Sequence, residues 1–234
     1  MKINYMKFSI LIPVYNEKDY ILEVLKRVNE QKKQFDLEII VSDDGSTDGT
    51  KEILKNNSKL FDYFLDEGVN QGKGVAVNKA IKQASGDYIL IQDSDLEYNP
   101  EDYKKMFTPA TNCNADVIYG SRFLGGEYVR LHFFWHYLAN KILTLLTNIF
   151  TNLNMSDMET GYKLFKTAAL KSIEIKEKSF GIEPEITIKL AKKNFIFYEV
   201  PIAYEGRSYE QGKKIKLKDA FVGIYCIFKY GFFG

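Results

Sequence analysis

The first 120 residues alternate between short apolar runs and segments with helical periodicity. The apolar runs are FSILIPV (8–14), LEIIVSD (37–43), FDYFLDE (61–67), DYILIQD (87–93) and ADVIYGS (115–121). Segments with helical spacing separate them, at 18–31, 48–57, 72–86 and 100–107. Because each connection is long enough for a crossover, this alternation predicts a mostly parallel sheet with helices on both faces. The sequence therefore predicts a doubly wound α/β core.

The second half of the chain has a less regular pattern. It predicts a long helix, a strand leading into a short helix, another helix, one or two strands and a final apolar helix, at 131–152, 161–170, 183–193, 195–205 and 217–234. One broad face of the long helix is apolar and consists of Leu131, Trp135, Leu138, Ile142, Leu145 and Ile149. Polar residues recur every four positions on another face, at His132, His136, Asn140, Thr144 and Asn148.

The composition is that of a globular protein, with 45% apolar and 27% charged residues. The net charge of +1 conceals an asymmetry, because residues 1–120 carry 15 Lys and Arg against 20 Asp and Glu, whereas 121–234 carry 17 against 11. An acidic half suits cations, and a basic half suits phosphates or an anionic membrane surface, although surface variation explains such a split equally well. We expect no nucleic-acid partner, no signal peptide and two reduced cysteines, Cys113 and Cys226.

Four polar stretches directly follow predicted strands. They are PVYNE (13–17), SDDGSTDGT (42–50), QDSDLEYNP (92–100) and YGSRF (119–123). The carboxyl ends of parallel strands line one edge of an open sheet, where ligands bind. Each stretch alone is also compatible with turn residues and a helix N-cap. Together they predict one shared crevice.

The third stretch places three carboxylates within five positions. Asp93 and Asp95 flank a single residue at the end of an apolar run, and Glu97 follows. Hard oxygen ligands with little His or Cys nearby suit Mg²⁺ or Mn²⁺. The alternative is that these acids cap the helix that begins at Pro100, where negative charge is favourable.

Seven segments in order give the chain a resemblance to a known family. ILIPVYNE, VSDDGSTDGT, GKGVAVNKAI, DYILIQDSDLEYNPEDY, VIYGSRF, DMETGYKLF and FGIEPEITIKL together resemble a family 2 inverting glycosyltransferase of the GT-A fold. The similarity is greatest to the dolichyl-phosphate mannose synthase and polyprenyl-phosphate glycosyltransferase branch. The resemblance implies a single GT-A catalytic domain over 1–234, in which 1–120 binds the nucleotide sugar and 121–234 the acceptor.

The resemblance also implies roles for individual residues. Asp93, Asp95 and Glu97 would hold the metal that bridges the donor's diphosphate, although the mannose synthases often have Gln in place of Glu97. The residues implied around the base and ribose are Pro13, Tyr15, Glu17 and Asp44. The candidate phosphate contacts are Lys73, Arg122, His136, Arg207, Lys213 and Lys214. The basic segment 206–218 is interpreted as a mobile lid over the donor, with a solvated loop as the alternative.

The acceptor decides whether a general base is required. A sugar hydroxyl needs a carboxylate to remove its proton, and Asp157 and Glu159 are the candidates. A lipid phosphate, with a second pKa of about 6, is already ionised near neutral pH and needs no base. The sequence therefore leads to a metal-dependent transfer of a hexose from a GDP- or UDP-hexose to a polyprenyl phosphate. Transfer to a saccharide hydroxyl and a non-catalytic nucleotide-sugar-binding regulator are the alternatives.

The apolar faces of 131–152 and 220–233 suggest contact with a membrane. No stretch offers 18 uncharged apolar residues, so these segments are expected to lie on a bilayer and not to span it. The alternative is that both faces pack in the core. The prediction is a peripheral protein on the cytoplasmic face of a membrane, a location that also admits an integral membrane partner protein.

Overall fold

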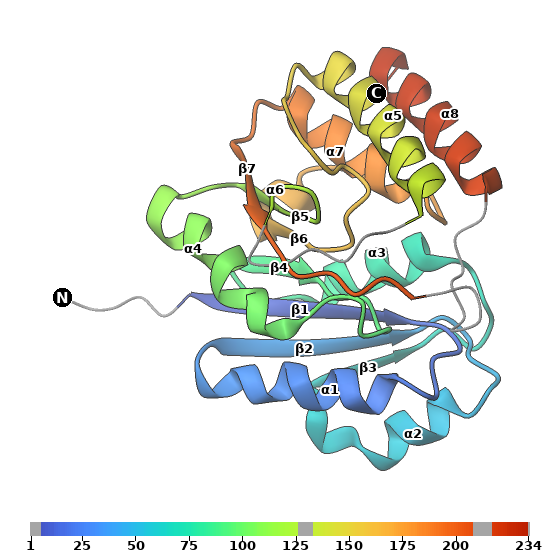
Figure 1. Ribbon diagram of the computed structural model, residues 1–234. Helices are drawn as coiled ribbons and strands as arrows, with labels where there is room; N and C mark the ends of the chain where they lie inside the picture. The colour runs from blue at the N-terminus through green and yellow to red at the C-terminus, as the bar shows by residue number, and fades with distance from the viewer. Residues whose placement is uncertain (1–5, 126–132, 208–216, 234) are drawn as a thin grey trace.

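The computed structural model describes residues 6–125, 133–207 and 217–233. Seven strands form one sheet in the order β3-β2-β1-β4-β6-β5-β7 (Figure 1). Their bounds are β1 Lys7–Val14, β2 Asp36–Asp43, β3 Tyr63–Asp66, β4 Tyr88–Ile91, β5 Val117–Ser121, β6 Lys163–Lys166 and β7 Phe197–Pro201. Neighbouring strands are parallel except around β6, which is antiparallel to both β4 and β5. The predicted doubly wound, mostly parallel sheet is confirmed.

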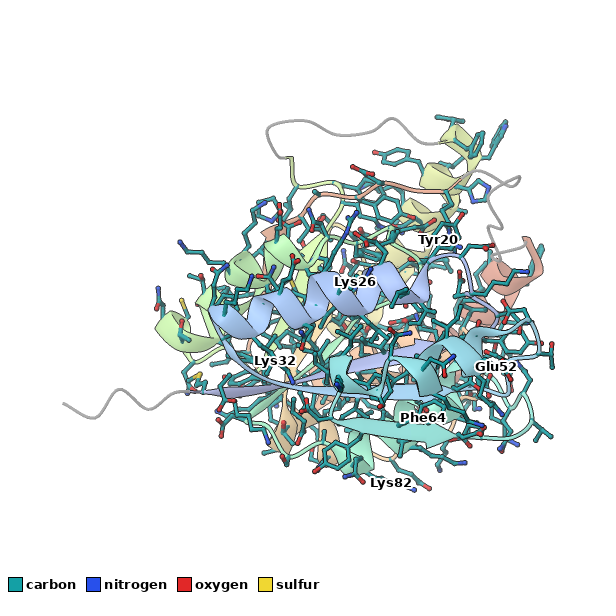
Figure 2. The ribbon with its side chains drawn as sticks, turned by 90° about the horizontal axis from the view of Figure 1, so that it is seen from below. Tyr20, Lys26, Lys32, Glu52, Phe64 and Lys82 are labelled. Atoms are coloured by element: carbon teal, nitrogen blue, oxygen red, sulfur yellow. The ribbon has the colours of Figure 1, made fainter. Side chains whose placement is uncertain are left out.

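Helices cover both faces of the sheet. They are α1 Ile21–Glu30, α2 Thr50–Asn56, α3 Lys73–Gln83, α4 Tyr103–Cys113, α5 Phe134–Thr151, α6 Thr167–Lys171, α7 Ile182–Lys192 and α8 Leu217–Phe233. Side chains alternate along each strand, so Ile10 and Ile12 pack under α1, α2 and α4, while Leu11 packs under α3 and the C-terminal helices. Figure 2 looks onto the first of these layers, where Lys26 marks the exposed side of α1 and Lys32 the turn that follows it.

Each strand and helix predicted in the first half is present, with small differences at the ends. The strand predicted to reach residue 93 ends at Ile91, because the next residues leave the sheet for the acidic loop. The helix predicted at 100–107 begins with a short 3₁₀ turn and then continues to Cys113 despite Pro109. The main feature that the sequence did not indicate is the position of β6 between β4 and β5, because β6 follows β5 in the chain.

The two longest helices, α5 and α8, pack side by side on one layer (Figure 1). The apolar face of α5 points outward, so Trp135 is 75% exposed and Ile149 is 67% exposed. Its buried residues include Asn140, Thr144 and Thr147, the reverse of an ordinary amphipathic helix. The alternative prediction, that this face of α5 packs in the core, is therefore wrong for the residues of the face that the structure describes.

Two further observations concern the described part of the chain. None of its helices combines the length and the apolar character needed to cross a membrane. The two cysteines form no disulfide, since Cys113 is exposed and Cys226 is buried elsewhere.

Candidate functional site

A cavity of about 340 Å³ opens at the carboxyl ends of β1, β2, β4 and β5. All four polar stretches singled out in the sequence contribute to its wall, and their lining residues include Pro13, Tyr15, Glu17, Asp44, Asp93, Asp95, Glu97 and Arg122. The second half of the chain adds further residues to the same wall, among them Glu159, Glu183 and Arg207. The predicted convergence at one edge of the sheet is therefore observed.

The buried side-chain amide of Gln92 holds the start of the acidic loop after β4. Gln92 accepts hydrogen bonds from the hydroxyls of Tyr103 at 2.9 Å and Tyr162 at 2.5 Å, and its own Nε2 donates to the carbonyl of Asp93. Leu96 then adopts a left-handed conformation with φ of 63°, which a branched residue rarely does. This network fixes the position of the backbone from which Asp93 and Asp95 project.

A close approach of the Gly161 backbone fixes the position of Asp93. The Gly161 N–H donates to the Tyr98 hydroxyl at 2.7 Å. A Cβ atom on Gly161 would collide with Oδ2 of Asp93 and would lie 2.8 Å from the Tyr98 ring. Only glycine therefore fits between the loop and the start of β6, a role that the sequence pattern did not reveal.

Cations of the protein bind two of the three predicted metal ligands, Asp93 and Asp95. Lys73 Nζ lies 2.8 Å from Asp93 Oδ1, and Arg207 Nη2 lies 2.8 Å from Asp95 Oδ2. Burial, together with the charges of Asp93 and Glu97, raises the pKa of Asp95 to about 7. Within the described ranges no three acidic, histidine or cysteine side chains already converge as a metal site. The two carboxylates still offer the hard oxygens that Mg²⁺ and Mn²⁺ prefer, so these residues fit such an ion.

The third acid, Glu97, is engaged with another segment. Its Oε2 accepts from the Tyr204 hydroxyl and its Oε1 from the backbone N–H of Arg207, both at 2.7 Å. Its carbonyl accepts from Glu205 N at 3.0 Å. In this arrangement Glu97 anchors the chain after β7, while its role as a metal ligand stays a prediction.

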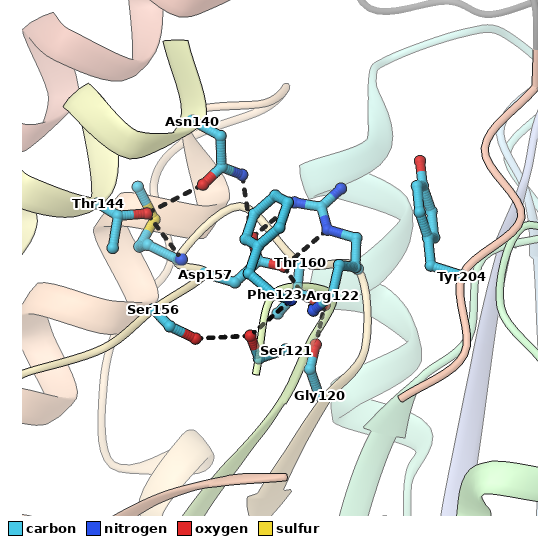
Figure 3. Close-up of polar contacts among 12 residues, drawn as sticks. Gly120, Ser121, Arg122, Phe123, Asn140, Thr144, Ser156, Asp157, Thr160 and Tyr204 are labelled. Atoms are coloured by element: carbon cyan, nitrogen blue, oxygen red, sulfur yellow. Dashed lines mark hydrogen bonds and ion pairs between the residues drawn. The ribbon is translucent and has the colours of Figure 1, made fainter. Parts of the chain in front are cut away.

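Arg122 forms a side-on, bidentate pair with the buried carboxylate of Asp157 (Figure 3). Its Nε and Nη2 donate to the two oxygens of Asp157, and Asn140 of α5 donates to the same carboxylate at 2.9 Å. The guanidinium also lies 5.0 Å from the centre of the Tyr204 ring. Burial raises the pKa of Asp157, but the Arg122 charge and the donated hydrogen bonds outweigh it and lower the pKa overall. Asp157 therefore positions Arg122: each of its oxygens accepts two hydrogen bonds from described residues, and it is not part of the cavity lining, where a base would need to lie.

Glu159 is a buried carboxylate of the cavity wall with one oxygen, Oε1, that accepts no hydrogen bond from the described residues. Burial is the main cause that raises its pKa to about 7, opposed by Lys163 and Arg122 and assisted by Glu183 and Asp157. Because Glu159 also lines the cavity, it can exchange a proton with a bound molecule near neutral pH.

The residues implied for the base and ribose, Pro13, Tyr15, Glu17 and Asp44, also line the cavity. The Asp44 carboxylate accepts the backbone N–H groups of Gln71 at 2.7 Å and Gly72 at 2.8 Å, which fixes the loop before α3. Tyr15 is 37% exposed, and Glu17 is buried against Arg207. Their predicted contacts with a nucleotide stay predictions.

Some predicted residues lie away from the cavity or outside the described ranges. His136 is half-buried, its ring is 5.8 Å from that of Phe133, and it is not part of the cavity lining. Lys213, Lys214 and His132 lie outside the described residues, as does most of the predicted lid at 206–218.

The contacts of some other residues were not predicted from the sequence, although the pattern of polar residues in α5 was visible there. The polar face of α5 binds the turn before β6, because Asn148 bonds both backbone groups of Met155 and Thr144 accepts from Met158 N. The four-residue recurrence of polar side chains indicated this face, and the structure shows that it bonds the backbone of the turn. Glu183, in the first turn of α7, pairs with the fully buried Lys163 at 2.5 Å.

The fold is similar to solved structures of glucosyl-3-phosphoglycerate synthase from Mycobacterium tuberculosis. One, in complex with Mn²⁺, UDP and phosphoglyceric acid, has a TM-score of 0.75 and 18% identity, with 97% of this chain and 78% of that chain covered. Another, in complex with Mn²⁺ and UDP-glucose, has a TM-score of 0.75 and 17% identity, with 96% and 79% covered. At this identity the likeness concerns the fold and agrees with the expected GT-A type.

Relatives in sequence include two archaeal proteins. A dolichol-phosphate mannosyltransferase of Pyrococcus furiosus is 29% identical over 90% of this chain. The low-salt glycan biosynthesis hexosyltransferase Agl6 of Haloferax volcanii is 27% identical over 86% of this chain. The chain spans 61% and 48% of the lengths of these two relatives.

The family comparison covers the strands β1 to β6 and the cavity residues that they carry. The family model described as glycosyl transferase family 2 matches residues 9–174, from β1 to the residues just after α6. This range is well over half of the chain and includes the acidic loop and Arg122. The chain therefore belongs to glycosyl transferase family 2.

Proposed function

We propose that the chain transfers a hexose, with inversion, from a nucleotide-sugar donor to a polyprenyl phosphate. The observation that carries this proposal is a single cavity whose lining contains Asp93 and Asp95, the cations Lys73 and Arg207 that pair with them, and a third cation, Arg122. Carboxylates and cations in one wall suit a diphosphate with its divalent ion. In this proposal the part of the cavity from 1–120 holds the nucleotide sugar and the part from 121–234 the acceptor.

The mechanism depends on stabilising the negative charge of the leaving group. Breaking the bond between sugar and phosphate leaves a nucleoside diphosphate with growing negative charge. Asp93 and Asp95 would hold Mg²⁺ or Mn²⁺, which would supply Lewis-acid stabilisation of that charge. Arg122, already oriented by Asp157, presents a planar cation to phosphate oxygens without having to be ordered during the reaction.

Both kinds of comparison support the choice of donor and acceptor. The Mycobacterium tuberculosis enzyme of similar fold was solved with Mn²⁺ and UDP, which supports a divalent ion and a GDP- or UDP-hexose. The Pyrococcus furiosus relative is named for dolichol phosphate, which supports a polyprenyl phosphate acceptor. An ionised phosphate attacks without a general base, so no carboxylate has to act as one in this reaction.

The outer faces of α5 and α8 support contact with a membrane, and we propose that the chain lies on its cytoplasmic face. Exposed apolar residues on α5 include Trp135, Leu145 and Ile149, and on α8 they include Phe221 and Tyr225. Helices of this kind lie in the interface plane with the apolar side in the lipid. A lipid-linked acceptor would then be available beside the cavity, since Asn140 on the inner side of α5 holds Asp157 and through it Arg122.

A second candidate function is transfer to a saccharide hydroxyl. Glu159, with its pKa raised to about 7, favours it, because a carboxyl of that pKa is well suited to remove a hydroxyl proton near neutral pH. If the acceptor is polyprenyl phosphate, no proton has to be removed from it and Glu159 has no role as a base. The acceptor therefore decides between the two.

A donor and acceptor screen tests the proposal. The purified chain is incubated with GDP- and UDP-hexoses and Mg²⁺ or Mn²⁺, with polyprenyl phosphate or free sugars as acceptor, and the labelled products are separated. We expect label in the lipid fraction, and the loss of that signal in Asp93→Asn with the fold retained. Label in saccharides alone would reject the lipid acceptor, and normal transfer by Asp93→Asn would reject the metal site.

A further inference from the structure

Each predicted metal ligand has a counter-ion that the chain itself supplies. Three of the four carboxylate oxygens of Asp93 and Asp95 have bonded partners, namely Lys73 Nζ, Arg207 Nη2 and the backbone N–H of Glu97. The side chains of Arg207 and Asp95 are only 10% and 15% exposed. A divalent ion and these cations cannot occupy the same oxygens, because like charges a few ångströms apart in a buried site repel strongly.

Each of the two cations also contacts a second carboxylate away from the pair. Arg207 donates to Glu17 at 3.1 and 3.3 Å, and Lys73 lies 3.6 Å from Glu183. If Arg207 leaves Asp95, or Lys73 leaves Asp93, the cation keeps this other partner. Its displacement from the acidic loop therefore does not leave an unpaired charge in the cavity wall.

The backbone that carries Arg207 is anchored independently of its side chain. Glu97 binds the Arg207 N–H and the Tyr204 hydroxyl, and Tyr98 forms a β-bridge with Tyr204. The buried Nε of Arg207 has no hydrogen-bond partner among the described residues and lies 3.6 Å from Glu97 Oε1 as an ion pair. The side chain can turn about a fixed backbone and still has an N–H to donate to a phosphate.

We propose that Lys73 and Arg207 compete with the divalent ion for Asp93 and Asp95, and that the donor's diphosphate binds these two cations once the ion has displaced them. The consequence is that the metal ion and the nucleoside diphosphate bind cooperatively. This inference rests on the proposed function of the same cavity. Because such coupling is reciprocal, each ligand raises the affinity for the other by the same factor, typically about 5- to 150-fold.

Direct binding measurements test this competition. Mn²⁺ affinity is measured by electron paramagnetic resonance, with and without GDP or UDP, for the wild type, Arg207→Gln and Lys73→Gln. We expect each variant to bind Mn²⁺ alone about 5-fold more tightly or better, whereas the nucleotide binds more weakly and the coupling factor falls toward 1. Arg27→Gln, which removes a surface pair with Glu23 in α1, is the matched control and should change none of these values.

The outcomes separate this inference from the proposed function. Weaker Mn²⁺ binding by Arg207→Gln in the absence of nucleotide would overturn the competition, because a purely supporting role predicts that result. Arg207→Lys keeps the charge, and we expect its Mn²⁺ affinity to stay near that of the wild type, so it distinguishes loss of charge from damage to the fold. A wild type that binds Mn²⁺ and nucleotide independently also rejects the competition but leaves the proposed function standing. A wild type that binds neither rejects the proposed function itself.

Discussion

The Asp157 carboxylate holds the Arg122 guanidinium through two hydrogen bonds of 2.7 Å, Nε to Oδ2 and Nη2 to Oδ1. Asp157 is fully buried, and a third bond joins its Oδ2 to the Arg122 backbone N–H at 3.0 Å. Two residues 35 positions apart thus form one planar unit at the cavity wall (Figure 3). The orientation of Arg122 is set by its partner before any ligand arrives.

Asp157→Ala should destabilise the fold and weaken phosphate binding together. Loss of one partner of a buried ion pair leaves the other charge uncompensated, which costs about 3–5 kcal/mol of unfolding free energy. Urea unfolding measures the first effect, and GDP or UDP affinity measures the second. Glu23→Gln, which removes a partner of the exposed pair with Arg27, is the control and should leave the unfolding free energy unchanged. If Asp157→Ala were as stable as the wild type, the pair of Arg122 and Asp157 would not stabilise the cavity wall.

Gly161→Ala should displace Asp93 and lower the affinity for Mn²⁺. The added methyl group would collide with the Asp93 carboxylate, and overpacking a tight site typically costs about 1–3 kcal/mol. Mn²⁺ titration and thermal unfolding measure the two effects. Gly223→Ala in α8 is the control, because its Cβ would lie 3.3 Å from Leu143 and alanine favours a helix. Wild-type Mn²⁺ affinity in Gly161→Ala would contradict this role for the close approach.

The strand ends of this fold were predictable because the relevant information is local. Apolar runs followed at once by polar residues predicted both the sheet and the edge at which Glu17, Asp44 and Asp93 meet. The spacing of Asp93 and Asp95 at the end of a buried run further indicated a pair of hard ligands. Each of these inferences needs a window of about ten residues and one general rule on parallel sheets.

The partners of those acids were not predictable because they come from distant segments. Arg207 reaches Asp95 across 112 residues, and Asp157 reaches Arg122 across 35. Their meeting depends on β6 lying between β4 and β5, and on Glu97 binding the chain after β7. No periodicity encodes such pairings. The sequence could therefore identify Arg207 as a cation of the site but not its present contact with a predicted metal ligand.

Polar substitutions on the outer faces of α5 and α8 should abolish binding to lipid vesicles without unfolding the protein. Leu145→Ser and Phe221→Ser remove apolar groups that are 60% and 66% exposed, so they take little from the core. Co-sedimentation with vesicles of anionic lipid at low salt measures the loss. Val69→Ser, at a site 66% exposed elsewhere on the molecule, is the control. A wild type that does not sediment with the vesicles would reject the membrane proposal.

Glu159→Gln should separate the two acceptor classes by the pH dependence of transfer. If the acceptor is a hydroxyl, Glu159 must be ionised, so the wild-type rate should rise with an apparent pKa near 7. The variant should then lose about 10²- to 10⁴-fold in rate, the usual contribution of a general base. With polyprenyl phosphate the variant should keep its rate. Steady-state rates from pH 5.5 to 8.5 with each acceptor decide this, and Glu30→Gln on the exposed end of α1 is the control.

The same variant should also change how stability depends on pH. The pKa of Glu159 is raised in the folded protein from its ordinary value of 4.5 to about 7, chiefly by burial. Between these two values the folded chain keeps a proton that the unfolded chain releases, so this group lowers stability as the pH rises through that window. Glu159→Gln cannot ionise, and it should exceed the wild type in unfolding free energy at pH 8 and lose that advantage near pH 5. Urea unfolding at the two pH values measures the difference, and a constant gap would mean that Glu159 does not titrate in this range.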